Sequence, residues 1–88
     1  IVNIVNGVQL KLKEHIEDIS KKSISEELSE LIFILVINIW NDISDEDKKI
    51  VFNNINYISK LKAKDKDGLS NKIIFKHMDI KDALDKLN

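Results

Sequence analysis

The feature that most constrains the fold is one nearly uninterrupted apolar run, LIFILVINIW, at residues 31–40. Nine of its ten residues are apolar, and the single exception is Asn38. Because so apolar a segment is stable only when other parts of a protein cover it, we expect the rest of the chain to pack around it. The run has half the length that a helix needs to cross a bilayer, so no membrane contact is expected.

This run is predicted to be the second half of a helix over residues 24–41. Ser23 and Glu26 have the spacing of a capping box, in which each side chain bonds the free backbone N–H of the other residue. A strand over residues 32–39 is the alternative, because β-branched residues dominate there. The capping signal and the length favour the helix. Because this helix is apolar on nearly all sides, we expect it to be central and buried.

Apolar residues recur at steps of three and four through the rest of the chain, which is the spacing of one helical face. This spacing predicts three more helices, at residues 8–20, 45–62 and 71–87. Together with the helix at 24–41 they predict an all-α fold. We expect a single compact four-helix domain over residues 1–88, with a buried apolar second helix.

Turn residues mark the expected boundaries between these helices. Ser44 and Ser70 stand where the third and fourth helices begin, and a serine at that place can accept hydrogen bonds from free backbone N–H groups. Gly68 lies in the loop between those helices and is predicted to adopt a positive φ.

Two segments stay open between alternative conformations. Residues 1–7 either extend the first helix or form a separate extended segment, because Gly7 weakens a helix. Residues 72–78 are predicted to be helical, with a strand as the alternative. A kink in the helix near Asp79 is also possible in sequence terms. Because the chain opens on Ile1 and not on Met, we expect a fragment that lacks its native N-terminus.

The composition excludes several kinds of chemistry. The chain has no Cys, so disulfides, thiolate catalysis and Cys-based metal centres are excluded. A secreted domain of this size would more often carry disulfides, so we expect a cytoplasmic protein. Every basic side chain is Lys, which disfavours sites that need the planar, bidentate guanidinium of Arg.

Candidate catalytic and metal-binding residues are few and poorly arranged. His15 and His77 are the only histidines, and neither lies in a metal-ligand motif. Asp65 and Asp67 precede Gly68 as in a calcium loop, but the remaining ligand positions of such a loop are not met. The residues therefore predict no enzyme activity, no catalytic residue, no metal and no cofactor.

Charge divides the chain into two unequal halves. Residues 1–47 hold four Lys against ten acidic residues, whereas residues 48–88 hold ten Lys against five. The acidic residues gather before the apolar run and just after it, where they also complement helix dipoles. We interpret them as the candidate partner-binding residues, which are Glu26, Glu27, Glu30, Asp42, Asp45, Glu46 and Asp47. If the second and third helices are antiparallel neighbours, these residues form two patches at opposite ends.

These observations favour a non-catalytic protein-binding module. Small inhibitors and toxin-immunity proteins are of this kind: they are short, often acidic, and neutralise a partner such as a bacterial toxin by occupying it. We expect the partner to be another protein with a basic surface, because opposite charges speed association. Trp40, at the end of the apolar run, is expected in the core, with a partly exposed interface anchor as the alternative.

Two other classes of function stay open. A nucleic-acid-binding or antitoxin-type regulator would use the Lys-rich half, above all Lys60, Lys62, Lys64 and Lys66. Interrupting acids and the absence of nearby aromatic residues disfavour that hypothesis. A helical docking domain or structural subunit of a larger protein is the third class. A homodimer also stays open, because a second copy would cover apolar surface that 88 residues leave exposed.

Overall fold

Four α-helices account for most of residues 2–87, which are the residues described by the computed structural model. They are α1 (Val2–His15), α2 (Lys22–Ile39), α3 (Asp45–Ser59) and α4 (Asn71–Leu87). Three short 3₁₀ helices lie between them, η1 (Ile19–Lys21), η2 (Trp40–Asp42) and η3 (Ala63–Asp65). The all-α, four-helix prediction is therefore confirmed, and no strand occurs among the described residues.

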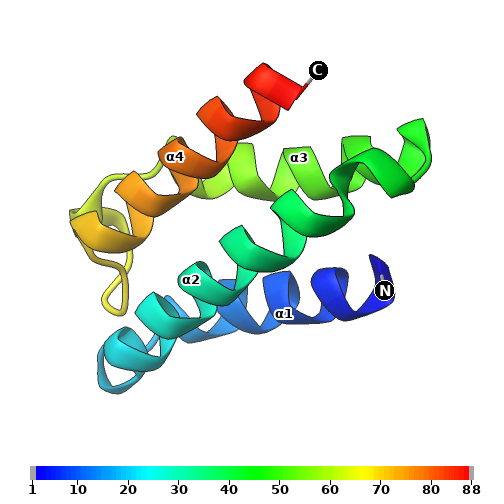
Figure 1. Ribbon diagram of the computed structural model, residues 1–88. Coiled ribbons are helices and arrows are strands. Elements are labelled where there is room, and N and C mark those ends of the chain that lie inside the picture. The colour runs from blue at the N-terminus through cyan, green and yellow to red at the C-terminus, as the bar shows by residue number, and fades with distance from the viewer. Residues whose placement is uncertain (1, 88) are drawn as a thin grey trace.

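Successive helices run in roughly opposite directions, and they lie around the core in the order α1, α2, α4, α3 (Figure 1). The second helix packs against α1 on one side and against α4 on the other, and α4 likewise has two principal neighbours, α2 and α3. The third helix packs chiefly against α4 and more lightly against α1. Of the successive pairs, α1 and α2 are antiparallel neighbours, as are α3 and α4, whereas α2 and α3 lie diagonally across the bundle.

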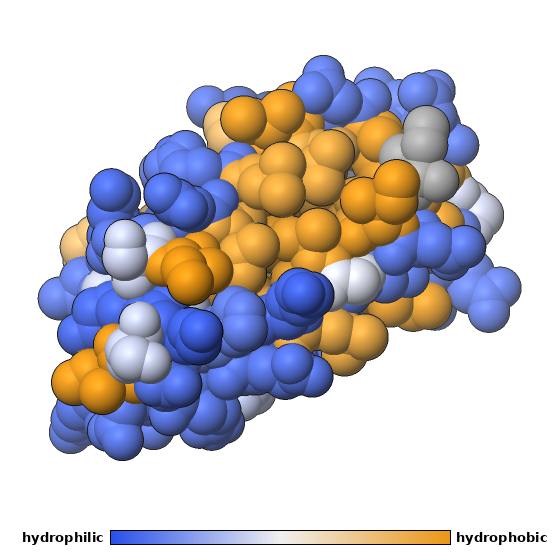
Figure 2. All heavy atoms as spheres, turned by 90° about the horizontal axis from the view of Figure 1, so that it is seen from below, coloured by the Kyte–Doolittle hydropathy of each residue, from blue (hydrophilic) through white to orange (hydrophobic). Residues whose placement is uncertain are grey.

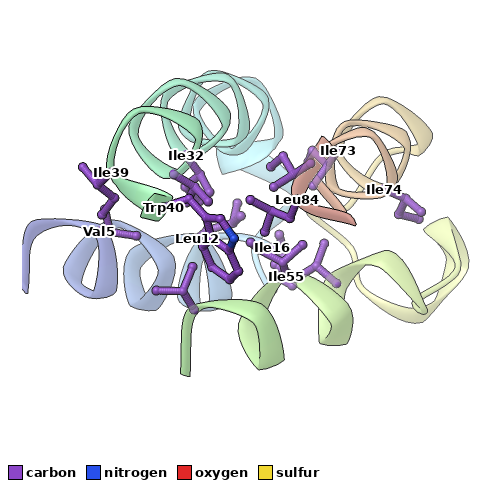
Figure 3. Close-up of a cluster of buried hydrophobic side chains, with 14 of the residues drawn as sticks. Val5, Leu12, Ile16, Ile32, Ile39, Trp40, Ile55, Ile73, Ile74 and Leu84 are labelled. Atoms are coloured by element: carbon purple, nitrogen blue, oxygen red, sulfur yellow. The ribbon is translucent and has the colours of Figure 1, made fainter. Parts of the chain in front are cut away.

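The core is almost entirely aliphatic and draws on all four helices (Figure 3). Val5 and Leu12 of α1, Ile32 of α2, and Ile55 of α3 are fully buried. Trp40 is also buried, at 2% exposure, so the predicted core position is confirmed and the interface-anchor alternative is not. The ring therefore closes the end of the bundle at which α2 passes into η2.

Helix boundaries differ from the predicted ones chiefly in the first half of the chain. The first helix ends at His15, five residues before its predicted end. It begins at Val2, so residues 2–7 are helical and the extended alternative is wrong for them, whereas residue 1 lies outside the described residues. The third helix ends at Ser59, three residues before its predicted end. Residues 72–78 are helical, and α4 continues through Asp79 without a break.

The predicted capping box at Ser23 is wrong. The second helix begins at Lys22, and the preceding residue, Lys21, makes no side-chain capping bond. Asp18 performs the capping earlier, because its carboxylate accepts bonds from the N–H and the hydroxyl of Ser20 at 2.9 and 2.8 Å. The turn of η1 formed there leads straight into α2, so Ser23 lies inside the helix.

The two later caps are as predicted. The Ser44 hydroxyl accepts a bond from the N–H of Asp47 at 3.1 Å at the start of α3. The Ser70 hydroxyl accepts a bond from the N–H of Ile73 at 3.3 Å at the start of α4. Each cap satisfies one backbone donor that the first helical turn leaves free.

Gly68 does not have the positive φ that was predicted, because no glycine among the described residues has one. Any residue could adopt its backbone conformation, but its surroundings leave no space for a side chain. The N–H of Gly68 donates to the carbonyl of Ile16 at 2.8 Å, and the carbonyls of His15 and Asp18 lie where a Cβ would project. The glycine is needed for the close approach of two backbones.

Candidate protein-binding surfaces

The first predicted acidic group, on the N-terminal half of α2, is largely engaged within the fold. Glu26 accepts a bond from the Ser70 hydroxyl at 2.9 Å, and Glu30 forms an ion pair with Lys76 at 3.3 Å. Both contacts join α2 to α4. Of this group only Glu27 is exposed without an ion pair among the described residues.

The second acidic group surrounds the start of α3 and projects into solvent. Asp42, Asp45 and Glu46 are exposed, and Asp47 is half-buried. None of the four takes part in an ion pair within residues 2–87. The adjacent Lys48 lies over the Trp40 ring, with its Nζ 5.5 Å from the ring centroid. We call Asp42, Asp45, Glu46 and Asp47 the acidic end.

The two acidic groups lie at opposite ends of α2, as predicted, although α2 and α3 are antiparallel without being the neighbours that the prediction assumed (Figure 1). The helix has 18 residues and a length of about 27 Å. Exposed charges separated by much more than about 10 Å are screened from one another at ordinary ionic strength. The seven predicted residues therefore do not form one site, and the acidic end is the group that forms no ion pair within residues 2–87.

The Lys-rich segment lies at the other end of α3 and in the loop that follows it. Lys60, Lys62 and Lys64 are exposed, whereas the ammonium of Lys66 lies 2.8 Å from the Glu17 carboxylate. That hydrogen bond and charge raise the pKa of Lys66. Asp65 accepts a bond from the backbone N–H of Lys62 at 2.8 Å. Residues 64–67 thus alternate in charge and Lys66 holds two loops together, whereas Lys60, Lys62 and Lys64 form no ion pair within residues 2–87.

The two histidines have different environments. His15 is half-buried at the end of α1. His77 is 1% exposed within α4. Its Nδ1 lies 3.0 Å from the Ile73 carbonyl, and burial lowers its pKa because the charged imidazolium loses its hydration. Within residues 2–87 no three His, Asp or Glu side chains are grouped to hold a metal ion.

Sequence reasoning missed an exposed apolar surface, because it placed the whole apolar run in the core. Leu31 is 42% exposed and Ile34 is 54% exposed, although both belong to that run. Ile24 in the same helix and Ile4 in α1 are 42% and 62% exposed. Figure 2 shows a continuous apolar area on the side of the molecule seen from below Figure 1.

The orientation of α1 explains how its apolar residues join those of α2. Gln9 and Lys13 lie on the flank of α1 that meets α3, since Gln9 donates to the Val51 carbonyl at 3.2 Å and Lys13 lies over the Tyr57 ring. Helical geometry then places Ile4 and Val8 on the opposite flank, beside α2. We call the following residues the apolar α1/α2 face: Ile4, Val8, Ile24, Leu28, Leu31 and Leu35.

Asn38, the polar residue of the run, is exposed at the end of this face. Its side-chain amide donates to the carbonyl of Ile34 at 2.8 Å, one turn earlier in the helix. It is therefore satisfied locally and does not need a partner in the core.

No protein-family model, curated protein or solved structure matches this chain. Among the helices of residues 2–87, none has the length and apolar character required to span a bilayer.

Proposed function

We propose that this chain is a non-catalytic protein-binding module of the inhibitor or immunity type, which neutralises a partner with a basic surface, such as a bacterial toxin, by docking through the acidic end. The observation that carries the proposal is the exposure of Asp42, Asp45 and Glu46, which form no ion pair within residues 2–87. An unpaired group of like charges on a rigid element attracts an oppositely charged surface and speeds its association.

The local structure supports this use of the acidic end. The Ser44 cap fixes the start of α3, so the carboxylates of Asp45 and Glu46 extend from a defined turn and not from a mobile loop. The buried ring of Trp40 anchors the preceding turn. Such preorganisation reduces the entropy that is lost on binding. A cytoplasmic location and a toxin as the partner are parts of this proposal.

Affinity capture with a matched pair of charge-reversal variants tests the proposal. The wild-type chain, Asp45→Lys/Glu46→Lys and Asp82→Lys/Asp85→Lys are immobilised and exposed to lysate of the organism that encodes the chain. Both variants change the charge by the same amount, and Asp82 and Asp85 are exposed on α4, a different helix from the one that carries the acidic end. Circular dichroism verifies that each variant is folded.

The expected result is one protein retained by the wild type and by the α4 variant, and lost by the acidic-end variant. Retention should weaken at high salt, because exposed charges carry the attraction. Equal retention by all three chains would exclude the acidic end as the docking surface. Capture of nucleic acid in place of a protein would favour the regulator hypothesis and contradict this one.

A further inference from the structure

The α2 part of the apolar α1/α2 face has a regular spacing. Ile24, Leu28, Leu31 and Leu35 follow one another at steps of four, three and four residues. This is the spacing of a coiled-coil seam, in which apolar side chains of two helices interdigitate at a crossing angle of about 20°. The α1 helix covers only one flank of this stripe, since Leu31 and Ile24 are each 42% exposed.

We propose that the apolar α1/α2 face binds a second copy of this chain, with the two α2 helices antiparallel across a two-fold axis. Antiparallel seams pair alternate positions, so Ile24 of one copy meets Leu35 of the other and Leu28 meets Leu31. The same pairs recur on the other side of the axis, as a two-fold interface requires. All four side chains of the stripe are then covered by apolar ones.

The polar residues at the edge of the face agree with this pairing. Continuing the register places Lys21 of one copy beside Asn38 of the other, so the seam ends on polar residues.

The size of the face fits a dimer of moderate affinity. The largest apolar patch on a monomer usually measures about 300–600 Å², and six partly exposed aliphatic side chains give a patch of about this size. One side of a standard interface measures about 800 Å², of which about 65% is apolar in homodimers. A face of this size corresponds to an interface at the small end of the range, which is typical of weak complexes, so we expect a Kd in the micromolar range.

This inference does not rest on the proposed function, because the acidic end lies outside the apolar α1/α2 face. In the antiparallel arrangement the C-terminal ends of the two α2 helices point away from each other. Each copy therefore keeps its acidic end free at an opposite end of the dimer.

Sedimentation velocity of the purified chain tests for the second copy. Over about 1–500 μM the wild type should pass from the monomer mass of 10.2 kDa toward twice that value. Leu31→Lys should raise the Kd at least tenfold. Leu10→Lys is the matched control, since Leu10 is 60% exposed on α1 outside the face, and it should leave the Kd unchanged. Circular dichroism verifies that both variants fold.

Cross-linking tests the antiparallel register, and the absence of native Cys gives a clean background. At 1.5 Å per residue, equivalent Leu31 positions lie about 5 Å apart along the axis, whereas equivalent Leu35 positions lie about 17 Å apart. Leu31→Cys should therefore react with a short thiol-specific cross-linker to give a covalent dimer, and Leu35→Cys should not.

A wild type that stays monomeric over the whole range would overturn the proposal and leave the face to a different partner. Equal loss of dimer in Leu31→Lys and Leu10→Lys would also overturn it, as a sign of unspecific association. Equal cross-linking at both cysteine positions would contradict the antiparallel register and indicate parallel helices.

Discussion

The backbone N–H of Gly68 donates to the carbonyl oxygen of Ile16 at 2.8 Å, which joins the loop after α1 to the loop before α4. A Cβ on Gly68 would lie 2.6 Å from the carbonyl oxygen of His15 and even closer to that of Asp18. The Lys66–Glu17 ion pair lies in the same two loops. This contact closes one end of the bundle, and it leaves no space for a side chain.

Gly68→Ala is expected to destabilise the protein by about 1–3 kcal/mol, because one of the two backbones must move to admit the methyl group. Gly7→Ala is the matched control. A Cβ on Gly7 meets nothing within 4 Å, and Ala favours the helix, so stability should rise by about 0.5–1 kcal/mol. Urea denaturation measures both changes, and an unchanged Gly68→Ala midpoint would contradict the close approach.

Stability should depend on pH through His77. Burial holds the pKa of His77 below its ordinary value of 6.5 in the folded chain, and the unfolded chain regains that value. Between the two values the unfolded state binds more protons, so the free energy of unfolding rises with pH there. Stability is complete above about pH 6.5 and falls as the pH drops toward the lowered pKa.

His77→Leu should remove this pH dependence, whereas His15→Gln should retain it, because His15 is half-buried and lies outside the core. Urea denaturation between about pH 5 and pH 7.5 is the measurement. The Asp18 carboxyl titrates separately, since its hydrogen bonds from Ser20 hold its pKa below 3.8. If His77→Leu lost stability on acidification as steeply as the wild type over this range, the assignment to His77 would be wrong.

Ser25→Ala is expected to stabilise the protein by about 1 kcal/mol. The Ser25 side chain is fully buried in α2, and its hydroxyl has no hydrogen-bond partner within residues 2–87. An unpaired buried hydroxyl is costly, and Ala is the better helix former. Ser29→Ala should change stability little, because the Ser29 hydroxyl donates to the Ser25 carbonyl at 3.0 Å and loses that bond. Equal effects at both positions would contradict the difference in hydrogen bonding.

Local signals in the sequence predicted most of the fold. Ser44 and Ser70 cap their helices as expected because the residue just before each serine is not helical. The prediction for Ser23 was wrong because Asp18 begins a 3₁₀ turn that continues into α2. A capping motif in the sequence does not reveal whether the chain is already helical before it.

The exposure of Leu31 and Ile34 could not be predicted from composition. An apolar helix shows which residues favour burial but not how many neighbours are available to cover them. In this bundle α2 has helical neighbours on two sides, α1 and α4, and its outer side has none within residues 2–87. Because the sequence does not show how many neighbours cover α2, the apolar α1/α2 face was not predicted.

Contacts between residues far apart in the sequence likewise could not be predicted from the sequence. The Asn54 side-chain amide donates to the Gln9 side chain at 3.2 Å, and Gln9 in turn donates to the Val51 carbonyl. Neither Gln9 nor Asn54 has a sequence neighbour that marks it as important, because these hydrogen bonds form only after α1 and α3 have packed. The division of the acidic residues into two groups was predicted because it follows from helix direction alone.

The association rate constant of the captured partner tests most directly the claim that the acidic end binds a basic surface. Stopped-flow mixing at low and high salt compares the wild type, Asp45→Lys/Glu46→Lys and Asp82→Lys/Asp85→Lys. The acidic-end reversal should lower the rate constant at low salt by about tenfold or more and remove its salt dependence, while the α4 reversal changes it far less. Equal rate constants and equal salt dependence in all three chains would contradict the claim.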